Sequence, residues 1–322
     1  MDAITISIER FDGTKRHRQE YRVEKSDILS KTVLGTLFHI KEKLDPTLNF
    51  TASCRSAICG ACGVRVNGHA ILACDTKIEE VFALYGANDL SISPLANYTV
   101  ISDLVVDWEP SLENLRKIRP ELAAKSEFSK EKGCTQSEAD FNNIKRMWDC
   151  ILCGCCASDC NKLTANRKDY LEPFVFTHAW RAAADSRNGD PMAHGRPAAD
   201  NGLWKCVHCQ ECANVCPKHI RSVDDIAGLR ALTVKNGMTQ GKGPAHANAF
   251  LTDLEKTGRL NEVTLALKTE GAAALLRVGL ACRLWMKGKI NPLEVLGDDP
   301  ISGHAELVSM LNAAKAVTKG TR

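Results

Sequence analysis

The sequence predicts a small α+β domain at the N-terminus, followed by a mainly helical remainder. Apolar and polar residues alternate along residues 3–9, which is the period of a half-buried strand. Asn67-Gly68 lies between the apolar segments VRV and AIL, a strong signal for a β-hairpin. After residue 107 the spacing of apolar residues becomes helical and stays so to the C-terminus.

Shorter signals place the other elements of the α+β domain. A turn at 13–14 separates the first strand from a partner strand. Ser26 or Asp27 can cap a helix that runs to about Lys43 and stops before a proline. Residues 90–93 alternate as one more short strand, so the domain ends near residue 107.

Composition sets limits on the kind of protein. The 322 residues carry 42 basic and 39 acidic side chains, a net charge of +3, which argues against a strongly basic nucleic-acid binder. The most apolar stretch, 272–286, is interrupted by Arg277 and Arg283 and is too short to span a membrane. The N-terminus has neither a signal-peptide core nor a twin arginine, so we expect no export signal.

Cysteine is the residue type that departs from ordinary usage, with 15 in the chain. Only Cys134 and Cys282 stand apart from three clusters. A disulfide framework of a secreted protein fits poorly, because a long chain without a secretion signal does not need such cross-links. Close spacing of cysteines in such a chain indicates metal binding.

The first cluster consists of Cys54, Cys59, Cys62 and Cys74. The spacing C-x4-C-x2-C with a distant fourth cysteine is that of a plant-type 2Fe-2S site. Glycines and an alanine at 60, 61 and 63 would let backbone N–H groups approach the sulfides and influence the potential. The alternative is a zinc site made of the same thiolates, although zinc sites favour paired C-x2-C segments.

Two further clusters each show the spacing C-x2-C-x2-C-x3-C of bacterial two-cluster ferredoxins. In that arrangement three cysteines of one run hold a cluster and the fourth ligates the neighbouring cluster. One 4Fe-4S cluster is therefore assigned to Cys150, Cys153, Cys156 and Cys216, and the other to Cys160, Cys206, Cys209 and Cys212. Cys155 falls outside the spacing and is interpreted as a packed thiol that binds no iron.

This order of motifs resembles the iron–sulfur subunit of succinate dehydrogenases and fumarate reductases over roughly residues 1–235. The segments CILCGCC, CPK and WRAAADSR are typical of that family. The resemblance implies a β-grasp ferredoxin domain at 1–107, an α-helical ferredoxin domain with two cubane clusters at 108–235, and a helical extension at 236–322. In this family the subunit connects a flavin subunit, where fumarate and succinate interconvert, to a membrane quinone site.

Several departures from the common family pattern indicate a branch. The common member lacks a cysteine at the position of Cys209 and then holds a three-iron cluster. Bulky tryptophans and a histidine near the quinone are replaced here by what look like Thr164, Ala165 and Val207. Together with the extension, these features resemble the branch of methylmenaquinol:fumarate and thiol:fumarate reductases, whose third subunit resembles a cysteine-rich heterodisulfide reductase.

We therefore expect an electron-transfer subunit of a fumarate reductase, with one 2Fe-2S cluster, two 4Fe-4S clusters and no catalytic residue of its own. The partners implied are an FAD-containing flavoprotein and a cysteine-rich subunit linked to quinol, with no nucleic acid. The same subunit of a succinate dehydrogenase or thiol:fumarate reductase is the alternative, as is a free-standing polyferredoxin. We expect peripheral attachment to the cytoplasmic membrane through the complex, on the periplasmic face if the flavoprotein carries a twin-arginine signal.

The apolar segment 272–286 has three interpretations. Leu275, Val278 and Trp285 recur at helical spacing, while Arg277 and Arg283 interrupt a second apolar row. The helix could pack on the core of this chain, lie on an anionic membrane surface, or bind the cysteine-rich partner. We favour binding of the partner, because the usual quinone contacts are replaced.

Overall fold

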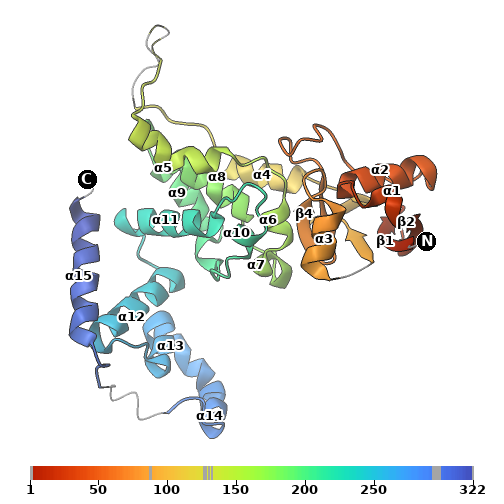
Figure 1. The fold of residues 1–322 in the computed structure, drawn as a ribbon. Helices are drawn as coiled ribbons and strands as arrows, with labels where there is room; N and C mark the ends of the chain where they lie inside the picture. The colour runs from red at the N-terminus through yellow and green to blue at the C-terminus, as the bar shows by residue number, and fades with distance from the viewer. Residues whose placement is uncertain are drawn as a thin grey trace. The chain divides into compact units, whose positions relative to one another are not determined.

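The computed structural model describes residues 3–86, 89–125, 129, 131, 133–291 and 299–320 (Figure 1). The chain divides into two compact units, Met1–Thr233 and Val234–Arg322. The first unit contains a mixed sheet followed by a group of helices, and all three cysteine clusters lie in it.

The sheet of the first unit has five strands in the order β2-β1-β5-β3-β4. β1 runs antiparallel to β2 and parallel to β5, and β3 is antiparallel to both β4 and β5. The predicted Asn67-Gly68 turn joins β3 to β4. The strands are β1 (Ala3–Phe11), β2 (Arg16–Glu24), β3 (Gly63–Val66), β4 (His69–Leu72) and β5 (Leu90–Ser93). β6 (Val100–Ser102) and β7 (Val105–Val106) form a separate pair.

The helix expected from Ser26 or Asp27 to Lys43 is in fact two helices, α1 (Lys25–Ile28) and α2 (Val33–Lys43). Thr32 interrupts it, because its hydroxyl caps α2 by accepting a bond from Gly35 N at 3.1 Å. The α2 face that carries Leu34, Leu37 and Ile40 is buried in the same core as the isoleucines of β1. The third helix of this domain is α3 (Ile78–Tyr85).

The helical part of the first unit places two short helices, α6 and α10, among longer ones. α8 is buried along most of its length and packs against α5, α6 and α9. The helices are α4 (Glu109–Lys117), α5 (Glu138–Trp148), α6 (Cys155–Ser158), α7 (Asn161–Ala165), α8 (Pro173–Ala183), α9 (Met192–Asp200), η1 (Leu203–Lys205), α10 (Glu211–Asn214) and α11 (Ser222–Lys235).

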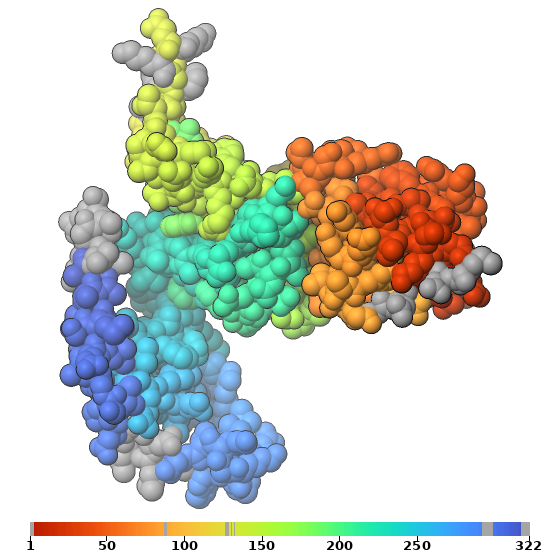
Figure 2. Space-filling view, in the orientation of Figure 1, coloured from red at the N-terminus to blue at the C-terminus, as the bar shows by residue number. Residues whose placement is uncertain are grey.

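Polar contacts join the sheet domain to the helical part. The Asp159 side chain, which is 6% exposed, accepts a bond from Ala70 N at 2.8 Å and pairs with Arg65 Nε at 3.3 Å. Asn97 Nδ2 donates to the carbonyl oxygens of Ala157 at 2.9 Å and Ser158 at 3.0 Å, which satisfies the end of α6. Figure 2 shows the two parts, in orange and in green and teal, meeting without a gap on the visible face.

The second unit consists of helices alone among its described residues. They are α12 (Lys242–Thr257), α13 (Glu262–Glu270), η2 (Gly271–Arg277), α14 (Val278–Met286) and α15 (His304–Gly320). α12 packs against α13 and α15, but α14 has no buried residue. Leu276 is 91% exposed, Met286 75% and Trp285 57%, whereas Ala274 of η2 is buried. None of the described helices combines the length and apolar content needed to cross a bilayer.

Candidate metal centres

The first cysteine cluster lies on the loop before β3 and at the end of β4. Arg55 and Ala57 take positive φ angles of 57° and 56°, which turns successive amides toward the cysteine sulfurs. Cys54 Sγ accepts from the amides of Ser56, Ile58 and Cys59 at 3.4, 3.4 and 3.3 Å. Cys74 Sγ accepts from Ala57 N at 3.3 Å, and Cys62 Sγ from Cys74 N at 3.4 Å.

These amides favour thiolate at one end of the site. The bonds from the backbone of Ser56 and Ile58 lower the pKa of Cys54 to about 6. Burial instead raises the pKa of Cys62 to about 12. Cys59 is exposed, so one edge of the site faces solvent.

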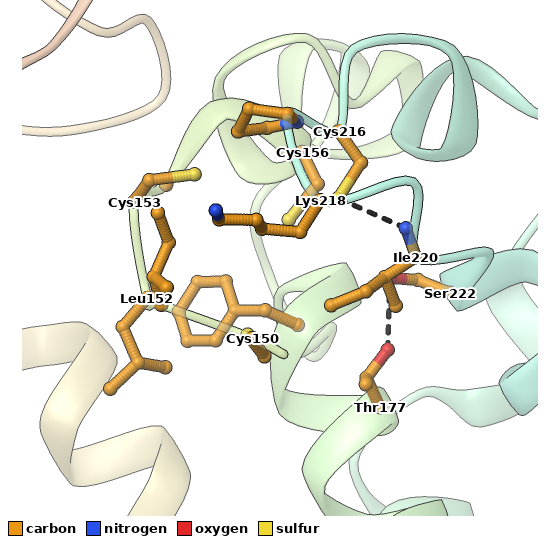
Figure 3. Close-up of a pocket in the computed structure, with 13 residues that line it drawn as sticks. Cys150, Leu152, Cys153, Cys156, Thr177, Cys216, Lys218, Ile220 and Ser222 are labelled. Atoms are coloured by element: carbon orange, nitrogen blue, oxygen red, sulfur yellow. Dashed lines mark hydrogen bonds between the residues drawn. The ribbon is translucent and has the colours of Figure 1, made fainter. Parts of the chain in front are cut away.

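The second site is a cavity lined by Cys150, Cys153, Cys156 and Cys216 (Figure 3). Three of these cysteines precede or open α6, and the fourth comes from the segment after α10. Cys216 Sγ accepts a bond from Ile220 N at 3.3 Å. Burial raises the pKa of Cys150 to about 11, and it raises that of Cys156 as well.

The third site is a cavity lined by Cys160, Cys206, Cys209 and Cys212. In both cavities, therefore, the fourth cysteine comes from the other run. Cys209 is exposed, which leaves this site open to solvent on one side.

The two runs have the same local backbone. Leu152 and His208, at equivalent positions, have φ angles of 53° and 54°, and Gly154 and Gln210 follow with 79° and 67°. The third cysteine of each run then sits at the second position of a short helix, Cys156 in α6 and Cys212 in α10. The repeat in sequence is thus a repeat in conformation, including a left-handed residue that is not glycine.

Cys155 is equivalent in this repeat to Glu211 and lies outside the cavity lining. It is completely buried in the hydrophobic core. Its thiol hydrogen-bonds to Cys153, which lowers the pKa of Cys153 and raises that of Cys155. Cys155, which the motif spacing excludes as a ligand, is therefore a neighbour of Cys153, which lines the cavity.

Hydroxyl groups form one wall of the second site. Thr177 and Ser222 line the cavity, and their oxygens lie 2.9 Å apart (Figure 3). Thr177 Oγ1 also donates to Asp225 Oδ2 at 2.7 Å, and Asp225 Oδ1 accepts from Arg146 at 2.7 Å. Asp225 is fully buried, so this ion pair fixes the wall behind the cysteines.

Two glycines bring the first site against the second. A Cβ at Gly60, whose φ is 74°, would lie 3.0 Å from Cys153 N and would also strike the carbonyl oxygen of Ile151. A Cβ at Gly63 would lie 2.6 Å from Cys153 O. The sequence predicted that these glycines let backbone amides approach the first cluster, and the structure adds that they permit contact with the second cysteine run.

The residues that the resemblance places near the quinone lie at the surface. Thr164 and Ala165 are exposed, and Thr164 Oγ1 accepts from Asn97 Nδ2 at 3.1 Å. Val207 lines the third site and is 67% exposed. Among the described residues, no group of three or more His, Cys, Asp or Glu side chains converges on a point that would hold a single metal ion.

The donor sets fit iron–sulfur clusters. Each of the two cavities is lined by four thiols, and the sulfurs of the first loop accept backbone N–H bonds of the kind that such clusters require. A mixed sheet domain with the first loop, followed by helices with the doubled run, defines a ferredoxin-type electron-transfer module with two domains.

Family models match both parts. A 2Fe-2S iron-sulfur cluster binding domain matches residues 5–113, and a 4Fe-4S dicluster domain matches residues 124–220. The 8-methylmenaquinol:fumarate reductase iron-sulfur subunit of Wolinella succinogenes is 60% identical over 97% of this chain and 98% of its own length. A mitochondrial succinate dehydrogenase [ubiquinone] iron-sulfur subunit of Oryza sativa subsp. japonica is 34% identical over 72% of this chain and 82% of its own length.

A solved structure shares the fold. A chain of the Mycobacterium smegmatis Sdh1 complex in the apo form covers 73% of this chain and 97% of its own length, with a TM-score of 0.63 and 21% identity. The protein belongs to the family of iron–sulfur subunits of fumarate reductases and succinate dehydrogenases. Its role is electron transfer within an oxidoreductase complex, as the resemblance in sequence predicted.

Proposed function

We propose that this chain relays electrons from a quinol-linked partner to a flavoprotein that reduces fumarate to succinate, in a reductase of the methylmenaquinol type. The observation that carries the proposal is the 60% identity to the Wolinella subunit over nearly the whole of both chains. The 34% identity to the rice subunit supports a second candidate, the same relay in a succinate dehydrogenase.

The chain would hold three clusters through the cysteines that line its three sites. The 2Fe-2S ligands are Cys54, Cys59, Cys62 and Cys74. The ligands of the two 4Fe-4S clusters are Cys150, Cys153, Cys156 and Cys216 in one, and Cys160, Cys206, Cys209 and Cys212 in the other. When bound, such clusters supply the one-electron redox chemistry that no side chain of the chain offers.

The protein's own residues arrange the sites in series. Gly60 and Gly63 let the first loop touch the run that starts at Cys150, and the crossed fourth cysteines join the second site to the third. Cys59 and Cys209, at the two ends, are exposed, while Cys153 and Cys156 in the middle are buried. Partners can therefore approach the terminal sites while the protein shields the central one.

The extension provides a surface for the quinol-linked partner, which we propose to be a cysteine-rich subunit. Coverage of 97% means that the Wolinella alignment includes most of Val234–Arg322, whereas the rice alignment covers 72% of the chain. η2 and α14 of this unit expose Leu276, Trp285 and Met286, an apolar surface suited to a protein interface. Attachment to the cytoplasmic membrane would then be peripheral and would depend on the partners.

Iron content tests the ligand sets. Anaerobically purified protein should contain about ten irons per chain, the sum for one 2Fe-2S and two 4Fe-4S clusters, together with acid-labile sulfide. Zinc without sulfide would contradict the assignment. Cys160→Ala should damage the cluster held by Cys206, Cys209 and Cys212, and Cys216→Ala the adjacent one; the opposite pattern would show that the fourth cysteines do not cross.

The complex tests the relay. The assembled protein should couple oxidation of a quinol to fumarate reduction, whereas the purified chain without flavin should not interconvert fumarate and succinate. Turnover by the isolated chain would contradict an electron-transfer role. Faster succinate oxidation than fumarate reduction would favour the second candidate. Migration of the native protein as a free 35.2 kDa species would instead favour an independent electron carrier.

Truncation tests the proposed role of α14. Ending the chain after Gly271 should preserve the clusters and the association with the flavoprotein, because all cysteines assigned as ligands lie in the first unit. The quinol-linked partner should be lost. Because the truncation also removes α15, Trp285→Ser on α14 and Met310→Ser on α15 are the matched pair, with 57% and 70% exposure, and only Trp285→Ser should weaken binding of this partner. Retention of that partner by the truncated chain, with normal electron transfer from quinol, would refute this role.

A further inference from the structure

The doubled cysteine run places a lysine at equivalent positions in both cubane sites. Lys162 follows Cys160 by two residues, and Lys218 follows Cys216 by two residues. Each lysine lines the cavity to which its cysteine belongs. The repeat thus puts one cation beside each set of four thiols.

The two lysines are oriented differently. Lys162 donates to the carbonyl oxygen of Asn166, and its ammonium lies 5.3 Å from the ring centroid of Tyr170. Lys218 lines its cavity, and its amine lies on the side of Cys153 (Figure 3). Among the described residues, no carboxylate lies within 4.0 Å of Lys218.

Other cations near the second site already have partners. Arg146, which acts on Cys216, pairs with the buried Asp225 at 2.7 Å. Arg181, which acts on Cys150, lies with its guanidinium carbon 4.3 Å from the ring centroid of Trp148. Lys218 lines this cavity, whereas Arg146 and Arg181 lie outside its lining, so the charge of Lys218 is the positive charge nearest the four thiols.

We infer that Lys218 is a positioning residue for the central 4Fe-4S cluster. It raises the reduction potential of that cluster by more than Lys162 raises the potential of the neighbouring cluster. Adding an electron increases the negative charge among the thiolates. A cation in a partly buried cavity interacts with that charge more strongly than the same cation would in bulk water. Lys162, held by Asn166 and Tyr170, exerts a smaller effect. The inference rests on the proposed ligand sets.

Redox titration of the full complex, followed by EPR, tests the inference. Lys218→Met should lower the midpoint potential of the cluster held by Cys150, Cys153, Cys156 and Cys216. We expect a shift of the reduction equilibrium of roughly tenfold, about 59 mV for a one-electron couple. Lys218→Arg should restore most of the potential, because the charge is retained.

Two matched variants serve as controls. Lys162→Met should move its own cluster by a smaller amount and leave the central cluster unchanged. Lys205→Met should move neither, because Lys205 adjoins Cys206 in sequence yet is exposed and pairs with Asp169 at 3.6 Å. An unchanged central potential in Lys218→Met, with full iron content, would overturn the inference. The inference would also be overturned if Lys162→Met shifted the midpoint potential of its own cluster as much as Lys218→Met shifts that of the central cluster. Iron missing from the parent protein would instead contradict the ligand sets themselves.

Discussion

Replacement of Gly60 by alanine should loosen the contact between the first and second cluster sites. The new Cβ would strike Ile151 O and lie 3.0 Å from Cys153 N, and φ is 74°. The left-handed conformation costs an L-residue roughly 1–2 kcal/mol, and overpacking a tight contact costs roughly 1–3 kcal/mol. We therefore expect a loss of stability of roughly 2–5 kcal/mol, because both costs apply.

Two other glycines separate these costs. Gly68 has φ 89° and nothing within 4 Å of its Cβ position, so Gly68→Ala carries the conformational cost alone. Gly63→Ala carries the steric cost alone, because its Cβ would lie 2.6 Å from Cys153 O where ordinary contact begins at 3.4 Å, a required shift of about 0.8 Å.

The assay compares anaerobic melting temperatures and the rate at which electrons supplied by quinol reach fumarate in the complex. Gly60→Ala should melt lowest, and both Gly60→Ala and Gly63→Ala should slow electron transfer, while Gly68→Ala should not. If Gly60→Ala matches Gly68→Ala in both measurements, the close approach of the two loops is not needed and the reasoning fails.

Further predictions concern individual side chains. Cys155→Ala should keep the full iron content and cost roughly 1–2 kcal/mol for a small buried cavity, whereas Cys156→Ala should lose a cluster; iron analysis that shows the reverse would exchange their roles. Cys209→Ile should leave a three-iron cluster with its own EPR signal, and such a signal in the anaerobically purified parent would contradict the assignment of Cys209. Burial, aided by Arg181, lowers the pKa of His178 to about 4, while an unfolded histidine titrates near 6.5, so the unfolded state binds more protons between these values and stability falls as pH is lowered from 7 toward 4. At pH 5.5 the loss due to this histidine is roughly 1.4 kcal/mol, and anaerobic thermal unfolding of His178→Phe at pH 7.5 and 5.5 should show a correspondingly smaller change than the parent.

The sequence by itself determined the chemistry of this protein. Cysteine spacing is a local property, because the ligands of one loop must reach one cluster, so C-x4-C-x2-C and the doubled run identified the kinds of site without tertiary information. The same holds for the hairpin at Asn67-Gly68, where two residues fix the turn. The capping of α2 by Thr32 was missed, because a helix-forming pattern on both sides concealed the break.

Only the tertiary structure decided how the sites are surrounded. That Gly60 faces Cys153, that Cys155 hydrogen-bonds to Cys153, and that Lys218 turns toward Cys153 while Lys162 turns to Asn166 all depend on segments remote in sequence or on side-chain directions. The exposure of α14 is of the same kind, because an apolar spacing of residues predicts a helix face but not what covers it. Residue type determines which atoms can bind iron, whereas packing determines which charges and neighbours those atoms meet.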